Sequence, residues 1–157
     1  MAHISIVIPV YRAEGYTPRK VSPPQVDNLL EQVADATQLL RDAHARFPQD
    51  PLIATNLGVF LLEQDRMQEG VEWLDRALKL DPRCAPAHYN LGTVLQNTGE
   101  LTAAVDHYVA ALRAAPSHIG ALSNLAHTQQ TLGQIDAAIA AYRQILTLRP
   151  HAAGIAS

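Results

Sequence analysis

The sequence has 157 residues, of which 48% are hydrophobic and 17% are charged. This length suits one domain or one compact repeat array, and the hydrophobic share is enough to bury a core, so a disordered chain and a pair of full enzyme domains are both excluded. The net charge of −3 gives no reason to expect nucleic acid or an anionic membrane as a partner. The single cysteine excludes an intramolecular disulfide and a cysteine-rich metal site.

The N-terminal segment, residues 1–22, contains an apolar run from Ile4 to Val10 that is far too short to span a membrane. Nearly all residues of the run are β-formers, so we expect an extended or strand-like segment. Residues 4–11, ISIVIPVY, resemble the first strand of family 2 nucleotide-sugar glycosyltransferases. A relic of such an enzyme, a disordered tail and a strand that pairs with another chain all stay open. The segment lacks the basic start and cleavage site of a signal peptide, and we expect a cytoplasmic protein.

Residues 23–48 are expected to form one long helix that caps the rest of the chain. Ser22 can cap its N-terminus, and Pro23 and Pro24 suit its first turn. Apolar residues recur at helical spacing along one side: Val26, Leu29, Leu30, Val33, Leu40 and Ala43. The opposite side is polar, so this helix resembles half a repeat that shields an array from water.

From residue 48 onward the sequence repeats itself with a constant step of thirty-four positions. The step links four prolines, Pro48, Pro82, Pro116 and Pro150. It also links three asparagines, each followed by leucine: Asn56, Asn90 and Asn124. Spacings of three and four between apolar residues, with turn signals at Asp65, Gly99 and Gly133, predict an antiparallel helix pair in each unit. The predicted units are 51–84, 85–118 and 119–152, followed by a tail at 153–157. The helices of the pairs are expected at 51–63 and 67–80, 85–97 and 101–114, and 119–131 and 135–148.

The Asn-Leu-Gly triplets at 56–58 and 90–92, the small residue twelve positions later and the closing proline resemble tetratricopeptide repeats. The resemblance implies an all-α fold, a right-handed superhelical array of antiparallel helix pairs with an N-terminal capping helix and a short extended N-terminal segment. It also implies a non-catalytic adaptor or scaffold for protein–protein interaction.

The first helices of the three units should line the inner groove of such a superhelix. The residues predicted to bind a peptide there are Thr55, Asn56, Val59, Tyr89, Asn90, Thr93, Ser123, Asn124 and His127. These residues are polar but almost uncharged, so we expect an extended peptide segment of a protein partner. The three asparagines form a ladder that can hydrogen-bond a peptide backbone, as in the resembling repeats of O-linked N-acetylglucosamine transferases. Alternatively, they form only local bonds.

No pattern in the sequence predicts catalysis or a bound cofactor. The seven histidines include no His-x-x-x-His pair, and Cys84 has no basic cluster around it. There is also no glycine-rich phosphate loop and no serine nucleophile motif. We therefore expect no catalytic residues, no metal site and no cofactor.

The last predicted helix presents apolar side chains that no following repeat covers. The expected association face consists of Ile139, Tyr142, Ile145 and Leu146. Charge is also uneven, because residues 1–84 carry 21 of the 27 charged side chains. These features predict either a piece of a longer chain or contact with a partner or a second copy. Two further functions stay open, a module of a larger enzyme such as a glycosyltransferase and a self-assembling structural scaffold.

Overall fold

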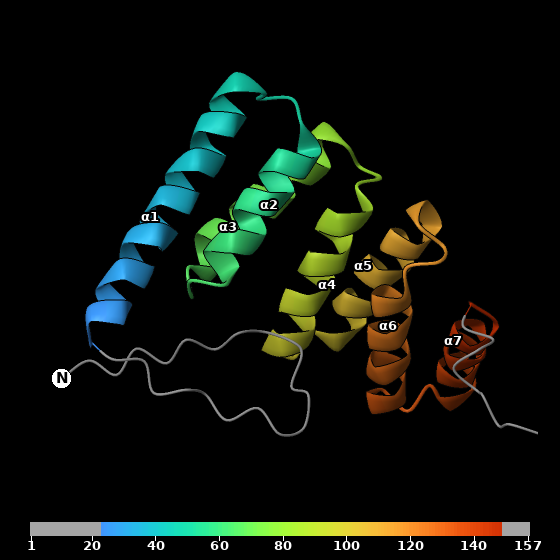
Figure 1. Cartoon of the computed structure of the whole chain (residues 1–157). Coiled ribbons are helices and arrows are strands. Elements are labelled where there is room, and N and C mark those ends of the chain that lie inside the picture. The colour runs from blue at the N-terminus through green and yellow to red at the C-terminus, as the bar shows by residue number, and fades with distance from the viewer. Residues whose placement is uncertain (1–22, 149–157) are drawn as a thin grey trace, which may run out of the picture.

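The computed structural model describes residues 23–148, with side chains from residue 31 onward. Over this range the chain forms seven helices and no strand (Figure 1). The helices are α1 (Pro23–Arg46), α2 (Pro51–Leu62), α3 (Met67–Leu80), α4 (Ala85–Thr98), α5 (Leu101–Ala114), α6 (Ile119–Thr131) and α7 (Ile135–Leu148). The predicted all-α array of helix pairs is confirmed. The strand-like segment and tail predicted at 1–22 and 153–157 lie outside the described residues.

The turns inside the three helix pairs share one backbone conformation. Asp65, Gly99 and Gly133 occupy equivalent positions in successive repeats and have positive φ angles of 59°, 88° and 74°. A residue in this left-handed region ends a helix, and glycine adopts it without the steric cost of a Cβ. Before the first pair, the Asp50 carboxylate accepts hydrogen bonds from the backbone N–H groups of Leu52 and Ile53, at 2.8 and 3.3 Å. These local signals fix where each helix starts and stops.

Each helix pair packs within itself and against the next pair. Helix α3 contacts α4, and α5 contacts α6 (Figure 1). The first helices also contact one another, α2 with α4 and α4 with α6, whereas no such contact joins α3 to α5 or α5 to α7 among the described helices. In a curved array the elements on the inner side lie closest together. Helices α2, α4 and α6 therefore line the inner side.

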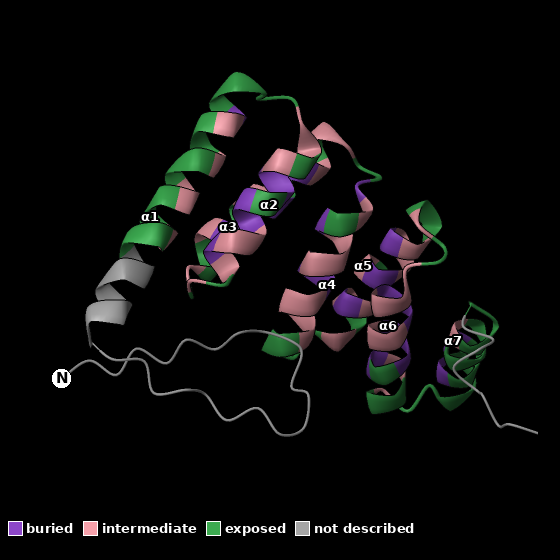
Figure 2. Ribbon diagram, viewed as in Figure 1, coloured by how far each residue is buried: buried purple, intermediate pink, exposed green. Residues whose placement is uncertain are grey.

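Small and aliphatic side chains fill the interfaces between pairs. The buried cluster between the first two pairs contains Ala54, Leu74, Ala77, Cys84, Ala87 and Leu91. A second cluster joins Ala104 and Tyr108 of α5 to Leu125 of α6. Figure 2 shows the buried residues concentrated in the middle of the array, with α1 and α7 largely exposed.

Helix α1 covers the N-terminal side of the first pair. The ring of His44 meets the ring of Trp73 on α3 edge to face, with centroids 4.7 Å apart. The Arg76 guanidinium lies over the same indole at 5.1 Å, an arrangement that favours the cation. Charged and polar residues dominate the exposed side of α1 over residues 31–46.

Candidate functional site

The nine residues predicted to bind a peptide all lie on the first helices, but they differ in accessibility. Asn56 and His127 are exposed. Six more are half-buried: Val59, Tyr89, Asn90, Thr93, Ser123 and Asn124. Thr55 is only 2% exposed, because its hydroxyl donates to the Pro51 carbonyl at 2.7 Å and lies 3.6 Å from the Cys84 sulfur. Thr55 thus belongs to the packing between α2 and α4. We refer to the other eight residues as the inner face.

A tyrosine that the sequence pattern did not mark as a site residue lies beneath the inner face. Tyr108 comes from α5, is fully buried, and its hydroxyl donates to Gln96 Oε1 at 2.7 Å. Asn124 Nδ2 donates to the same hydroxyl at 3.3 Å, and Thr93 Oγ1 lies 3.4 Å away. Burial raises the pKa of Tyr108 above its ordinary value, so the phenol stays protonated and can donate. The hydroxyl thereby connects α4 to α6.

The same pairing of tyrosine and glutamine occurs in the last repeat. Tyr142 and Gln130 are the counterparts of Tyr108 and Gln96 in that repeat, and their polar atoms are 3.5 Å apart. Tyr142 is 41% exposed, however, and no asparagine of a following helix reaches it within the described residues. The recurring tyrosine and glutamine columns were the sequence signal for this contact.

Removing the Tyr108 hydroxyl should weaken the fold measurably. We expect Tyr108→Phe to lower the free energy of unfolding by about 1 kcal/mol, because the bond to Gln96 is short but only partly buried, so Gln96 can bond to water instead. Tyr142→Phe is the matched control and should change the free energy by less than about 0.5 kcal/mol. Urea unfolding followed by circular dichroism measures both. Equal losses in the two variants would show that the hydrogen bonds of the Tyr108 hydroxyl do not contribute to stability.

The three asparagines of the predicted ladder are not equivalent. The side chain of Asn56 makes no hydrogen bond to any described residue. Asn90 Nδ2 donates to the Pro86 carbonyl of its own helix at 2.7 Å, whereas Asn124 donates across to Tyr108. The difference arises because the residue sixteen positions earlier is Tyr108 for Asn124 but Leu74 for Asn90. Each Oδ1 atom still accepts no hydrogen bond from the described residues.

An aromatic contact fixes the surface beside Asn90. The Tyr89 ring lies 4.7 Å from the ring of His118 and 6.2 Å from that of Tyr108. His118 Nδ1 accepts the Ala121 N–H at 3.0 Å and so caps α6. Tyr89 is therefore held in place as an apolar surface next to the carboxamides. None of the eight inner-face residues is an acid, a lysine or an arginine, so the face is neutral.

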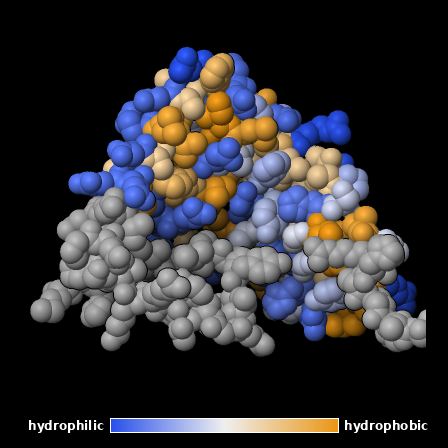
Figure 3. Space-filling model, viewed as in Figure 1, coloured by the Kyte–Doolittle hydropathy of each residue, from blue (hydrophilic) through white to orange (hydrophobic). Residues whose placement is uncertain are grey.

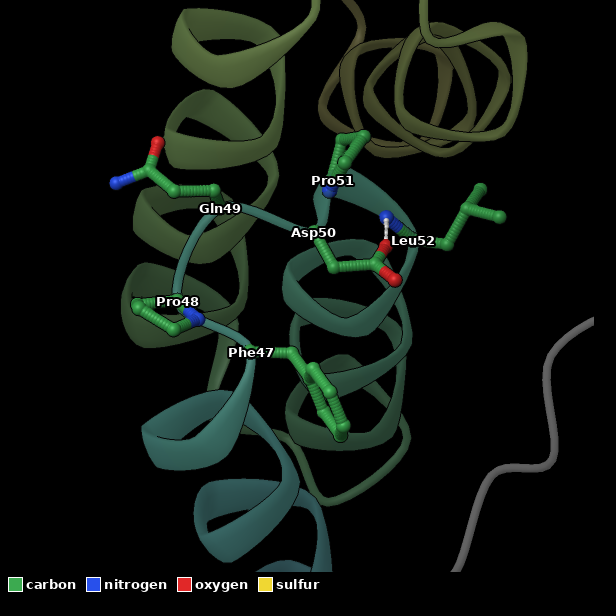
Figure 4. A pocket seen from close by; sticks show the side chains of 6 residues that line it. All are labelled: Phe47, Pro48, Gln49, Asp50, Pro51 and Leu52. Atoms are coloured by element: carbon green, nitrogen blue, oxygen red, sulfur yellow. Dashed lines mark hydrogen bonds between the residues drawn. The ribbon is translucent and has the colours of Figure 1, made fainter.

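Two pockets among the described residues lie away from the inner face. One, of about 460 Å³, is at the turn between α1 and α2 (Figure 4). Its lining residues are Phe47, Pro48, Gln49, Asp50, Pro51 and Leu52. The other lies between α1 and the turn from α2 to α3. Neither pocket contains an inner-face residue.

Two histidines form a direct pair between α4 and α5. Their Nδ1 atoms, in His88 and His107, are 3.1 Å apart, and His88 Nε2 lies 3.0 Å from the Pro82 carbonyl oxygen. A carbonyl only accepts, so His88 carries its proton on Nε2 and accepts the His107 Nδ1–H bond. Within the described part of the chain, no group of three or more histidine, cysteine or acidic side chains could hold a metal ion.

Acidification should destabilise the fold through two histidines, His107 and His44. Burial, with a smaller contribution from His88, lowers the pKa of His107 against the opposing effect of Asp75 and Asp106, and burial and Arg76 lower the pKa of His44. The two histidines therefore bind protons more readily in the unfolded chain than in the folded one. Their contribution to the free energy of unfolding is full above about pH 6.5 and is lost as the pH falls below that value. Thermal unfolding between about pH 7.5 and pH 5.5 should show a melting temperature that falls by several degrees.

Substituting the histidines tests whether they cause this pH dependence. His107→Gln should flatten the fall in melting temperature, and His44→Gln/His107→Gln should flatten it further. An unaltered slope in the His107 variant would mean that other groups carry the dependence.

Two family models described as tetratricopeptide repeat match the sequence, one over residues 29–95 and the other over residues 83–151. Together they span more than half of the chain. The chain is a tetratricopeptide-repeat protein. Such repeat arrays are scaffolds for protein–protein interaction and are generally non-catalytic. No curated protein matches the chain.

The tetratricopeptide array is similar to several solved structures of MamA. A crystal structure of MamA is 21% identical with a TM-score of 0.66, and the match covers 83% of this chain and 76% of that chain. MamA 41-end from Desulfovibrio magneticus RS-1 is 24% identical with a TM-score of 0.65, and the match covers 82% and 73%. At these identities the likeness shows the fold alone. None of the described tetratricopeptide helices is long and apolar enough to cross a membrane.

Proposed function

We propose that this tetratricopeptide-repeat protein is a cytoplasmic, non-catalytic adaptor that holds an extended peptide segment of a protein partner against its inner face. One observation carries the proposal. Asn56, Asn90 and Asn124 recur at the same position of each repeat on adjacent first helices, and their Oδ1 atoms are not engaged by described residues. A peptide backbone offers N–H donors that match these acceptors.

The spacing of the helices supports an extended ligand. Packed helix axes lie roughly 8–10 Å apart, and an extended peptide rises about 3.3 Å per residue. Successive asparagines would therefore meet about every third residue of a peptide that crosses α2, α4 and α6. Three contacts of this kind span roughly seven residues.

Apolar contacts have to supply part of the affinity. A hydrogen bond contributes only about 0.5–1.5 kcal/mol net, because the peptide gives up bonds to water. Tyr89, held by His118, offers an aromatic surface beside Asn90, and Val59 offers an aliphatic one on α2. His127 is exposed on α6 and would contact the side chain of the peptide at that end. The neutral face favours peptides whose central residues are uncharged.

A selection from random twelve-residue peptides displayed on phage provides the probe for a test. Selected peptides are synthesised with a fluorophore, and their affinities are measured by fluorescence polarisation. For the triple variant Asn56→Ala/Asn90→Ala/Asn124→Ala we expect binding at least about tenfold weaker, the equivalent of 1.4 kcal/mol. Circular dichroism confirms that the variant remains helical.

The matched control removes three carboxamides that lie off the inner face. Gln38→Ala/Gln68→Ala/Gln134→Ala changes exposed residues on α1, on α3 and in the turn before α7. This variant should bind the selected peptides as the wild type does. Equal affinity of the asparagine variant and the wild type, with the fold intact, would contradict the proposed role of the inner face.

The enzyme-module alternative rests on residues 4–11, which lie outside the described residues. Its other support, the uncovered side of α7, fits a second copy of this chain as well.

A further inference from the structure

Helix α7 ends the described array with an apolar side uncovered. Among the described helices it contacts only α6. Four large side chains that α6 does not cover are 41–60% exposed: Ile135, Ile139, Tyr142 and Leu146. We refer to these four residues as the α7 stripe; hydrophobic atoms are visible at this end of the molecule in Figure 3. Ile145, the other residue of the predicted association face, is half-buried and shares a helix side with the buried Ala138 and Ala141.

In the preceding repeat, where another helix follows, the equivalent residues are buried or partly buried. The counterparts of Ile139, Tyr142 and Leu146 one repeat earlier are Val105, Tyr108 and Leu112 of α5. There the tyrosine is fully buried and the other two are partly buried, in contact with the cluster that includes Leu125 of α6. The α7 stripe is therefore a surface that another helix can cover.

The charged residues of α7 indicate which helix covers the α7 stripe. The stripe has the 4-3-4 spacing of a coiled-coil seam, with Ile139 and Leu146 at a positions and Ile135 and Tyr142 at d positions. The two charged residues of α7, Asp136 and Arg143, each follow a d position and are exposed, so both are at e positions. On the opposite flank, the g positions are Ala138 and Ile145.

We propose that α7 pairs in antiparallel orientation with α7 of a second copy of this chain. When Ile139 of one copy faces Tyr142 of the other, Ile135 faces Leu146, so the stripe is complementary to itself. In antiparallel helix pairs, e positions face e positions, which brings Asp136 of each copy beside Arg143 of the other. In a parallel pair the same charges would face uncharged g positions. The arrangement of opposite charges thus selects both the occupant and its direction.

The pairing involves one short helix from each chain, so it belongs to the small, weak class of interfaces. We expect a dimer that forms in the micromolar range and depends on concentration. The inner face lies on α2, α4 and α6 and stays open in the dimer. If the proposed function holds, the dimer presents two peptide-binding faces and gains avidity for partners that carry repeated segments.

Charge exchange tests the orientation directly. Sedimentation velocity of the whole chain at about 1–300 μM, without peptide, gives the dimerisation constant. Asp136→Arg and Arg143→Asp each place like charges side by side and should weaken the dimer about tenfold or more. The double variant restores opposite pairs and should dimerise as the wild type does. A wild type that stays monomeric, or single variants that dimerise unchanged, would overturn the proposal and leave the stripe to another segment or partner.

Cysteine pairs give a second readout of direction, since the native Cys84 is buried. An equal mixture of Ile135→Cys and Leu146→Cys chains should form disulfide-linked dimers on mild oxidation, whereas each variant alone should not. Linking of each variant alone, but not between the two, would indicate a parallel pair and contradict the proposal. Because no peptide is present, either failure leaves the proposed function of the inner face untouched.

Discussion

Leu74→Ala is expected to lower the free energy of unfolding by about 3 kcal/mol. Leu74 is fully buried on α3, in the cluster that joins the first repeat to Ala87 and Leu91 of the second. Truncating such a leucine costs the transfer free energy of the lost methyl groups and leaves a cavity, about 2–5 kcal/mol in all. The small residues around it, among them Ala54 and Ala77, cannot reach across to fill the space.

The measurement is urea unfolding of the Leu74→Ala variant, with Leu39→Ala as the control. Leu39 is 70% exposed on α1, so its truncation should change stability by less than about 0.5 kcal/mol. Because repeats contact only their neighbours, amide exchange should accelerate in α2, α3 and α4 and change little in α7. Equal stability of the two variants would show that the first interface is not packed as described.

The sequence predicts the fold well because its signals are local and repeated. The left-handed turns at Gly99 and Gly133, and the substitute Asp65, fix the helix ends to within a residue. Prolines near the other boundaries act in the same way, since proline cannot continue a helix interior. A constant step that places the same signals in three units leaves little freedom for another arrangement.

The chemistry of the inner face was less predictable, because it depends on which residues meet between repeats. Thr55, Tyr89 and Ser123 share one column, yet only Thr55 is buried, since it meets Cys84. In the same way, Asn124 reaches across its interface because the preceding repeat supplies Tyr108. Comparing equivalent positions of the repeats one at a time does not show which residues at different positions contact each other.

The arrangement of side chains on the inner face depends on tertiary contacts that the sequence does not show. Tyr108 fits the sequence pattern as a packing residue, and its ring is indeed buried. Its hydroxyl, however, links α4 to α6 beneath the asparagines and fixes the position of Asn124. The column shared by Gln96 and Gln130 could have suggested this, because each lies twelve positions before a tyrosine.

Helices α2 and α3 approach each other closely at Gly58 and Gly70. A Cβ atom added to Gly58 would lie 2.9 Å from the Gly70 carbonyl oxygen and 3.0 Å from Leu74 Cγ. The first of these is backbone, so the new methyl group can be accommodated only if α2 and α3 move apart. Separating the two helices loosens the packing of Leu57, Leu61 and Leu74, all fully buried.

We expect Gly58→Ala to lower the free energy of unfolding by about 2 kcal/mol, although alanine favours a helix over glycine by about 1 kcal/mol. Gly120→Ala makes the same change on α6, where a Cβ would meet the His118 ring at 3.2 Å and the Tyr89 hydroxyl oxygen at 3.3 Å. Both contacts are with side chains and need a shift of only a few tenths of an ångström, which leaves the Tyr89–His118 contact in place, so this control should keep its stability or gain slightly. Repeat three tolerates alanine at the equivalent pair, Ala126 and Ala138, which implies a wider separation of α6 and α7. If Gly58→Ala unfolds at the same urea concentration as the wild type, the backbones of α2 and α3 do not meet closely at Gly58.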